Sequence, residues 1–146
     1  MYIIENRTLE RYEFKYFLRT DICKEIINHV KHFMTLDKFA NKFKKKNYFV
    51  RSIYFEDSTN SNFEDKINGY RIRKKFRLRQ YDQDLKSNPL FLETKGRNLE
   101  RTYKRRVKID HNDLDLINNS KSINILLNKY PNSQTIREFV FEYHKK

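Results

Sequence analysis

Apolar and basic residues alternate most regularly between residues 70 and 81. Successive side chains of a β-strand point to opposite faces, so this alternation predicts a strand with two unlike faces. The largely apolar face carries Tyr70, Ile72, Phe76 and Leu78. The other face carries five cations in line, Arg71, Arg73, Lys75, Arg77 and Arg79. Because these cations repel one another, we expect an anion to lie along them.

Two segments before residue 70 also have the composition of strands. Residues 9–18 place the charged Arg11, Glu13 and Lys15 on one face and aromatic residues on the other. Residues 48–55 are rich in aromatic and β-branched residues, which favour strands. We expect this second strand to be mostly buried.

The last two predicted strands are residues 90–95 and 100–109. The first places Glu93 and Lys95 on one face, and Gly96 makes the turn that follows it. In the second, three residues face the core: Tyr103, Val107 and Ile109. Four polar residues are then left on the opposite face: Thr102, Lys104, Arg106 and Lys108.

Helices are predicted between and after the strands. A first helix begins at Thr20 or Asp21, either of which can cap it, and has apolar residues at helical spacing, Ile22, Ile26, Val30 and Phe33. A short helix over 62–67 closes at Asn68-Gly69, residues 82–89 form a loop, and helical segments follow at 111–117 and 122–127. The last helix contains Ile136, Phe139, Val140 and Tyr143. These elements predict one α+β domain, residues 1–146, with an antiparallel sheet of about five strands and flanking helices.

The net charge of +13 indicates an anionic partner. Residues 70–109 contain 14 Lys or Arg and 4 Asp or Glu, which is +10 of the +13 within 40 residues. The single cysteine excludes an intrachain disulfide and a multi-cysteine metal site. No stretch is long and apolar enough for a transmembrane helix, and the N-terminus does not read as a signal peptide. We therefore expect a cytoplasmic location.

If antiparallel neighbours align their charged faces, the cations converge on one concave surface that suits a polyanion. The residues that would meet there are Lys15, Arg77, Arg79, Lys95, Lys104 and Arg106, with Glu13 and Glu93 among them. The two carboxylates could hold Mg²⁺ or Mn²⁺ that bridges phosphate oxygens. Because Gly69 and Gly96 are the only glycines, a glycine-rich phosphate loop is excluded, and phosphate contacts would come from side chains.

Five segments in order carry a resemblance to a known family: Arg-Tyr-Glu-Phe-Lys-Tyr at 11–16, Val-Arg-Ser-Ile-Tyr-Phe-Glu-Asp at 50–57, Arg-Leu-Arg-Gln-Tyr at 77–81, Leu-Phe-Leu-Glu-Thr-Lys at 90–95 and Lys-Arg-Arg-Val at 104–107. They resemble the VTC domain, the vacuolar transporter chaperone polyphosphate polymerase domain. That family belongs to the triphosphate tunnel metalloenzymes. The resemblance therefore implies a partial antiparallel β tunnel lined by basic residues and a few acids.

The resemblance also implies roles for particular residues. The positions that match phosphate-binding cations of the family are Lys15, Arg77, Arg79, Lys95 and Lys104, and Arg106 is expected to join them. Glu13 and Glu93 match acidic positions and are candidates for binding Mn²⁺ or Mg²⁺ or for orienting the cations. The implied activity is transfer of phosphoryl groups from ATP to a polyphosphate chain.

The family's tunnel has a second half, with further basic residues and a metal-binding glutamate, after the point where this sequence ends. We therefore expect the chain to resemble the N-terminal half and to expose strand edges that invite self-association or a second chain. On this ground, binding of ATP or polyphosphate is a firmer prediction than turnover.

The alternative function is a non-catalytic module that binds a polyanion, either polyphosphate or nucleic acid. Proteins that bind single-stranded nucleic acids place aromatic side chains beside the cations. Here the alternation places the aromatic residues mostly on the opposite face, which makes nucleic acid the weaker alternative.

Overall fold

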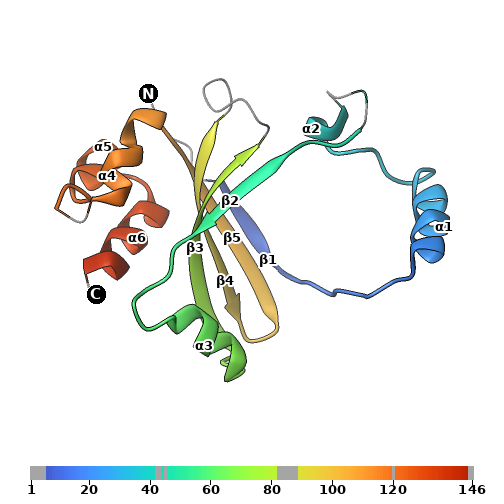
Figure 1. The fold of residues 1–146 in the computed structure, drawn as a ribbon, viewed down its shortest axis with the longest axis horizontal. Helices are drawn as coiled ribbons and strands as arrows, with labels where there is room; N and C mark the ends of the chain where they lie inside the picture. Colours follow the sequence, from blue (N-terminus) through green and yellow to red (C-terminus); the bar gives the residue numbers. More distant parts are fainter. Residues whose placement is uncertain (1–5, 42–43, 45, 82–88, 120, 145–146) are drawn as a thin grey trace. The chain divides into compact units, whose positions relative to one another are not determined.

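The structure is a computed structural model that describes residues 6–41, 44, 46–81, 89–119 and 121–144. It divides into two units, one formed by residues 1–12 and 50–146 and the other by residues 13–49 (Figure 1). The first unit contains the β-sheet and the C-terminal helices. The second contains two helices, and each unit is described by itself.

The first unit is built on an antiparallel sheet of five strands in the order β1-β5-β4-β3-β2 (Figure 1). The strands are β1 (Asn6–Tyr12), β2 (Val50–Tyr54), β3 (Ile72–Tyr81), β4 (Leu90–Asn98) and β5 (Arg101–Ile109). The α+β class and the five antiparallel strands are confirmed. Within the described residues the sheet is open, with β1 and β2 as its edges.

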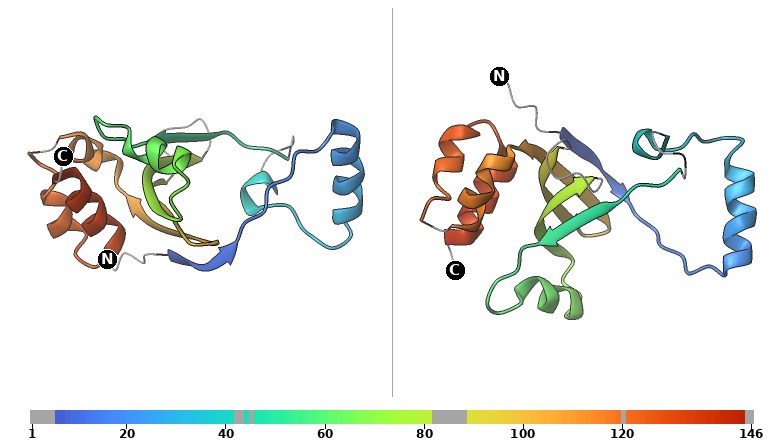
Figure 2. Two further views of the ribbon diagram at one scale, coloured as in Figure 1. Left: turned by 90° about the horizontal axis from the view of Figure 1, so that it is seen from below. Right: turned by 45° about the horizontal axis from the view of Figure 1, so that its top comes forward.

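One face of the sheet is covered by the C-terminal helices, which lie together on that side in both views of Figure 2. They are the 3₁₀ helix η1 (His111–Asp113), α4 (Leu114–Asn118), α5 (Ile125–Lys129) and α6 (Gln134–His144). Phe139 of α6 is fully buried and makes edge-to-face contacts with Phe55 and Phe76, at centroid distances of 4.8 and 5.4 Å. The core therefore lies between this face and the helices, as the alternation of β3 and β5 predicts.

The helix α3 (Ser61–Ile67) connects β2 to β3. The carboxylate of Asp57 accepts a hydrogen bond from the Ser61 amide at 2.9 Å, and that of Glu56 accepts one from the Asn62 amide at 3.0 Å. These bonds satisfy amides at the start of the helix. Gly69 follows the helix with φ +71°, so the predicted Asn-Gly end is confirmed.

Two expectations about the strands are wrong, and one predicted loop lies almost entirely outside the described residues. The strand predicted over 9–18 ends at Tyr12, and residues 13–19 are not strand. The second strand is not mostly buried: β2 is an edge strand with a single neighbour, and residues 51–54 are exposed. The predicted loop over 82–89 lies, except for Pro89, outside the described residues.

The third wrong expectation is the turn at Gly96. β4 continues through it to Asn98, and the chain turns at Leu99, which has φ 54°. Gly96 lies directly opposite Tyr103 of β5, whose ring occupies the space that a Cβ atom would fill. The glycine is needed for this close approach of a ring and a backbone, not for a turn.

The second unit contains α1 (Thr20–Val30) and α2 (Lys38–Asn41). The predicted first helix is confirmed, although it ends before Phe33. Capping by Thr20 or Asp21 is wrong, because the N-cap position is Arg19 and no side chain caps the helix. The Asp21 carboxylate instead pairs with the Arg19 guanidinium at 2.7 Å.

The substitution Gly96→Ala should lower the free energy of unfolding by about 1–3 kcal/mol, because an added group must displace its neighbours. A Cβ atom there would lie 2.1 Å from Cζ and 2.3 Å from the hydroxyl oxygen of Tyr103. Urea unfolding measures the loss. In a Tyr103→Ala background the same substitution should cost little, and an equal loss in both backgrounds would contradict this explanation.

Candidate functional site

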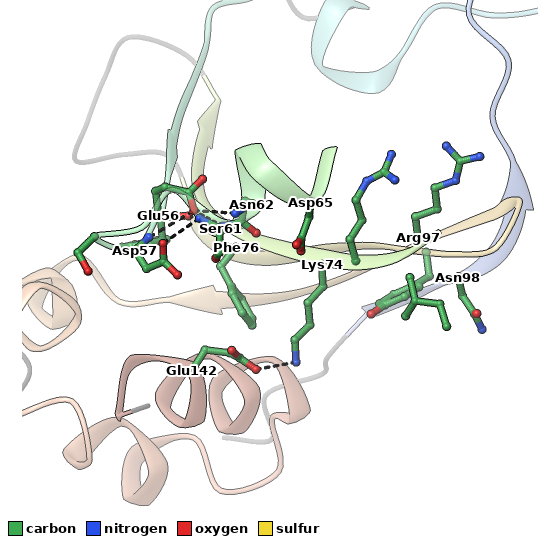
Figure 3. A pocket seen from close by; sticks show the side chains of 15 residues that line it. Glu56, Asp57, Ser61, Asn62, Asp65, Lys74, Phe76, Arg97, Asn98 and Glu142 are labelled. Carbon is green, nitrogen blue, oxygen red and sulfur yellow. Dashed lines mark hydrogen bonds and ion pairs between the residues drawn. The ribbon is translucent and has the colours of Figure 1, made fainter. Parts of the chain in front are cut away.

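The face of the sheet turned away from the C-terminal helices carries nine cations from β3, β4 and β5. We call it the cationic face: Arg73, Lys75, Arg77, Arg79, Lys95, Arg97, Lys104, Arg106 and Lys108. Figure 3 shows the two faces at one end of the sheet, where Lys74 and Phe76 point toward α6 and Arg97 points to the opposite side.

The strand register arranges these cations in four rows that cross the strands. Arg73 lies opposite Arg97 in the first row, and Lys75, Lys95 and Lys104 are successive partners in the second. The third row contains Arg77, Glu93 and Arg106, and the fourth contains Arg79, Phe91 and Lys108. Like charges directly opposite one another destabilise a sheet. The second row, with three lysines in succession, concentrates this repulsion.

The two faces differ in how their cations are paired. On the face toward the helices, Lys74 pairs with Glu142 at 3.1 Å and Arg105 pairs with Glu138 at 2.6 Å. On the cationic face, Glu93 is the one carboxylate that β3, β4 and β5 provide, and Glu100, in the turn between β4 and β5, pairs with Arg97 at 3.0 Å. The cationic face therefore has a large local excess of positive charge.

The centre of the cationic face is a buried ion pair. Arg77 Nε and Nη2 both approach Oε2 of Glu93, at 2.8 and 2.7 Å, and Nη1 donates to the Tyr54 hydroxyl at 2.9 Å. Glu93 is 0% exposed and Arg77 is 9% exposed. Burial lowers the pKa of Arg77, but the hydrogen bonds to Glu93 and Tyr54 outweigh it and raise the pKa above its ordinary value. Arg77 is therefore a fixed cation.

Two polar atoms on this face are buried without a hydrogen-bond partner in the part of the chain that the structure describes. They are Nε of Arg79 and Oε1 of Glu93. A buried donor without a partner is costly, and a phosphate oxygen can accept its hydrogen bond. Arg79 is thus suited to an anionic ligand.

The pKa of Lys104 reflects the local excess of positive charge. Burial lowers its pKa, and the charges of Arg106, Arg77 and Arg79 lower it further, while Glu93 opposes the shift. The net result is a pKa below the ordinary value of 10.5. An anion bound beside Lys104 would reverse this shift.

Aromatic rings also lie on the cationic face, contrary to the expectation that they fall mostly on the other side. Lys75 Nζ lies 4.7 Å from the ring centroid of Tyr54, and the guanidinium carbon of Arg106 lies 4.7 Å from that of Phe91. That of Arg79 lies 5.3 Å from the centroid of Tyr81. Three rings are therefore occupied by the chain's own cations.

The chain was compared with models of known protein families. The model of the VTC domain matches residues 10–145, nearly the whole chain. The chain belongs to the VTC domain family. No curated protein and no solved structure matches it significantly.

Within this VTC domain, six of the eight predicted site residues come together on the cationic face: Arg77, Arg79, Lys95, Lys104, Arg106 and Glu93. The other two do not join them in the sheet. Lys15 and Glu13 follow β1, in the second unit, and pair with each other at 3.6 Å. The predicted strand over 9–18 is what placed them on the sheet, and β1 ends before them.

The predicted site omits four cations of this face. The alternation places Arg73, Lys75 and Lys108 on the charged faces of their strands, and the same period of two extends to Arg97. Tyr54 has no such signal, because its role depends on β2 being an edge strand beside Arg77.

The side chains that the structure describes do not form a site that would hold a divalent ion by themselves. No group of three or more His, Cys, Asp or Glu side chains that could hold a metal occurs among the residues described. Glu93 is fully buried and its Oε2 atom is bound by Arg77. Mg²⁺ or Mn²⁺ would therefore need phosphate oxygens as further ligands.

A cavity of about 950 Å³ lies where β3 begins and β4 ends, and its lining includes Arg73 and Arg97 of the cationic face (Figure 3). Its lining includes Glu142 and Lys74, which pair with each other, and Glu56 and Asp57, which accept hydrogen bonds from the start of α3. We interpret this cavity as the space where α3, the sheet and α6 meet.

In the ranges that the structure describes, no helix is long and apolar enough to span a bilayer.

Replacing Glu93 with glutamine should lower the free energy of unfolding by about 3 kcal/mol, because it leaves the buried Arg77 cation without a counter-charge. Chemical denaturation measures the loss. Glu100→Gln is the control, since Glu100 pairs on the surface with Arg71 at 2.8 Å and with Arg97 at 3.0 Å, and its replacement should barely change the midpoint. A similar midpoint for both variants would contradict the role of the buried pair.

Lys104 should make the stability of the protein rise with pH in the alkaline range. Folding lowers its pKa below 10.5, so the unfolded chain binds this proton more tightly, and the free energy of unfolding increases as the pH rises from the folded-state pKa toward 10.5. Lys104→Met should lack this contribution, whereas Lys108→Met, an exposed control on the same face, should keep it. A pH dependence that is unchanged in Lys104→Met would contradict the prediction.

Proposed function

We propose that the cationic face binds the phosphates of ATP and polyphosphate, and that this VTC domain transfers phosphoryl groups from ATP to a polyphosphate chain. The observation that carries the proposal is the four rows of cations on β3, β4 and β5. Among the residues of these three strands, Glu93 is the one carboxylate on the same face. The membership in the VTC domain family supports it.

The length of the cationic face favours a chain of phosphates over a single one. Residues that share a face of a strand are two positions apart, so the rows repeat about every 7 Å and the four rows span roughly 20 Å. Side chains present charge along this whole length. A linear polymer of phosphate satisfies all four rows at once, whereas a single phosphate reaches one or two.

The side chains divide the work of binding. Arg77 is held by Glu93 and contributes a fixed charge, so we assign to Glu93 the role of orienting this cation. Arg79 and Arg106 offer planar groups that bind phosphate oxygens in a bidentate manner, and Lys95 and Lys104 provide point charges. Phosphoryl transfer depends mainly on such positioning and charge stabilisation.

A divalent ion and the second unit complete the proposal. Mn²⁺ or Mg²⁺ would reach the site on the phosphate oxygens of ATP, where it neutralises charge on the transferred group. Lys15 and Glu13 remain predicted phosphate and metal ligands of the second unit.

We further propose that the sheet is one wall of a triphosphate tunnel. The wall that faces it would come from strands outside this sheet, and a second copy or another chain could supply them. In the part of the chain that the structure describes, β1 and β2 are the edge strands of the sheet, and edge strands can pair with further strands. Binding is then a property of the cationic face alone, and turnover requires both walls.

Nucleic acid is the less favoured ligand, because aromatic rings of the cationic face already contact cations of the same chain. Bases stack on aromatic faces in single-strand binding proteins. Here Arg106 lies against Phe91 and Arg79 against Tyr81, so the rings serve the cations instead.

The variant Arg79→Ala/Lys95→Ala should bind tripolyphosphate and long-chain polyphosphate at least about tenfold more weakly, since it removes two charge-assisted contacts. Isothermal titration calorimetry at two salt concentrations measures the affinity. The control is Arg101→Ala/Arg137→Ala, which removes the same charge away from the cationic face and should change the affinity little.

Single-stranded DNA of matched charge is the competing ligand in the same titrations. Equal affinity of the protein for all three ligands, with the same loss in both double variants, would overturn the proposal and leave a nonspecific basic surface. Turnover is tested separately, by following polyphosphate formation from ATP with Mn²⁺.

A further inference from the structure

We propose that Tyr54 is a positioning residue of the cationic face, which holds Arg77 through its hydroxyl and Lys75 through its ring so that both meet adjacent phosphoryl groups. The inference rests on the proposed function and extends it to two residues, Tyr54 and Lys75, that sequence reasoning did not include in the site.

Tyr54 reaches the cationic face from the edge strand. It is the last residue of β2 and lies directly opposite Arg77 of β3, which places its side chain on the same face of the sheet. Its hydroxyl accepts a hydrogen bond from Arg77 Nη1 at 2.9 Å, while Arg77 Nε and Nη2 bind Glu93. Arg77 is thus fixed from two sides, by a residue on each neighbouring strand.

The ring of Tyr54 has a second partner. Lys75 Nζ lies 4.7 Å from its centroid, whereas the guanidinium carbon of Arg77 lies 5.7 Å from it. Lys75 begins the lysine row, opposite Lys95, where repulsion would drive a flexible side chain away. Attraction to the ring opposes that repulsion and keeps the ammonium group over the face.

Tyr54 is not a core residue. Its side chain is 49% exposed, on a strand whose residues 51–54 are all exposed. Neither its ring nor its hydroxyl contributes to the cluster formed by the other sheet face and the C-terminal helices. The contacts of Tyr54 with Arg77 and Lys75 are therefore what its substitution changes first.

The arrangement also gives the Tyr54 hydroxyl a role toward the ligand. A phenol that accepts one hydrogen bond can donate another, and a phosphate oxygen is a strong acceptor. Burial raises the pKa of Tyr54, but the hydrogen bond from Arg77 and the charges of Arg77, Lys75 and Lys95 outweigh it and lower the pKa below 10.0. A more acidic phenol donates a stronger hydrogen bond. Tyr54 thus lies between two cations and can contact the phosphate that bridges them.

A double-mutant cycle with tripolyphosphate as the probe tests the inference. Lys75→Ala should weaken binding about threefold in the wild-type and in Tyr54→Phe, which keeps the ring. In Tyr54→Leu, which lacks the ring, Lys75→Ala should have almost no further effect. Tyr54→Phe by itself should weaken binding, because the contact to Arg77 is lost while Lys75 stays in place.

The coupling between the substitutions of Tyr54 and Lys75 distinguishes a positioning role of Tyr54 from a purely structural one. A substitution that only loosened β2 would add its effect to that of Lys75→Ala, so additive losses in the Tyr54→Leu background would overturn the inference. Ile53→Ala is the matched control, since this exposed residue belongs to β2 and faces away from Arg77. It should leave both the affinity and the effect of Lys75→Ala unchanged.

Two further measurements keep the outcomes distinct. If wild-type protein does not bind tripolyphosphate, the proposed function fails and this inference fails with it, whereas intact binding with additive losses overturns this inference only. If Tyr54→Leu does not fold, Tyr54→Thr replaces it, because threonine favours strands and lacks a ring. In the NMR spectrum of the wild-type protein, the side-chain methylene signals of Lys75 should show a ring-current shift that is lost in this variant. If the wild-type protein shows no ring-current shift of these signals, the contact between Lys75 and the Tyr54 ring is contradicted.

Discussion

The repulsion among nine cations on one face is the constraint to which the rest of the first unit responds. The fold meets it in two ways. Glu93 is buried among the cations and binds Arg77, and the opposite face gains stability from a core of apolar residues under the C-terminal helices. The charge that remains is not neutralised by carboxylates of β3, β4 and β5, and this is the physical basis for the anionic ligand that we propose.

The cations on the two faces of these strands have different neighbours. Lys74 and Arg105 face the helices, and α6 provides a carboxylate for each of them. The cations at the alternate positions of these strands, among them Lys75, Arg79 and Arg106, face the other side, where aromatic rings are their more frequent neighbours. A ring attracts a cation without neutralising it, so the rings order the cations and leave their charge available to a ligand.

Much of this could be predicted from the sequence, because the pleat of a strand fixes which residues share a face. The alternation in β3 and β5 identified both the apolar face and seven of the nine cations that meet on the other side. The end of β1 could not be predicted, since residues 13–18 keep the same alternation without strand partners. Tyr54 could not be predicted either, because its surroundings depend on which strand becomes the edge of the sheet.

The contact between Gly96 and Tyr103 has a consequence for how the hairpin of β4 and β5 aligns. The ring fits only over a residue without a Cβ atom, and β4 contains one glycine. If β4 shifted by a single residue against β5, the ring would meet the side chain of Lys95 or Arg97 instead. Such a shift would also turn Glu93 and Lys95 toward the core and expose Leu92. The steric fit at one end of the hairpin therefore selects the alignment that keeps the charges on one side and the core on the other.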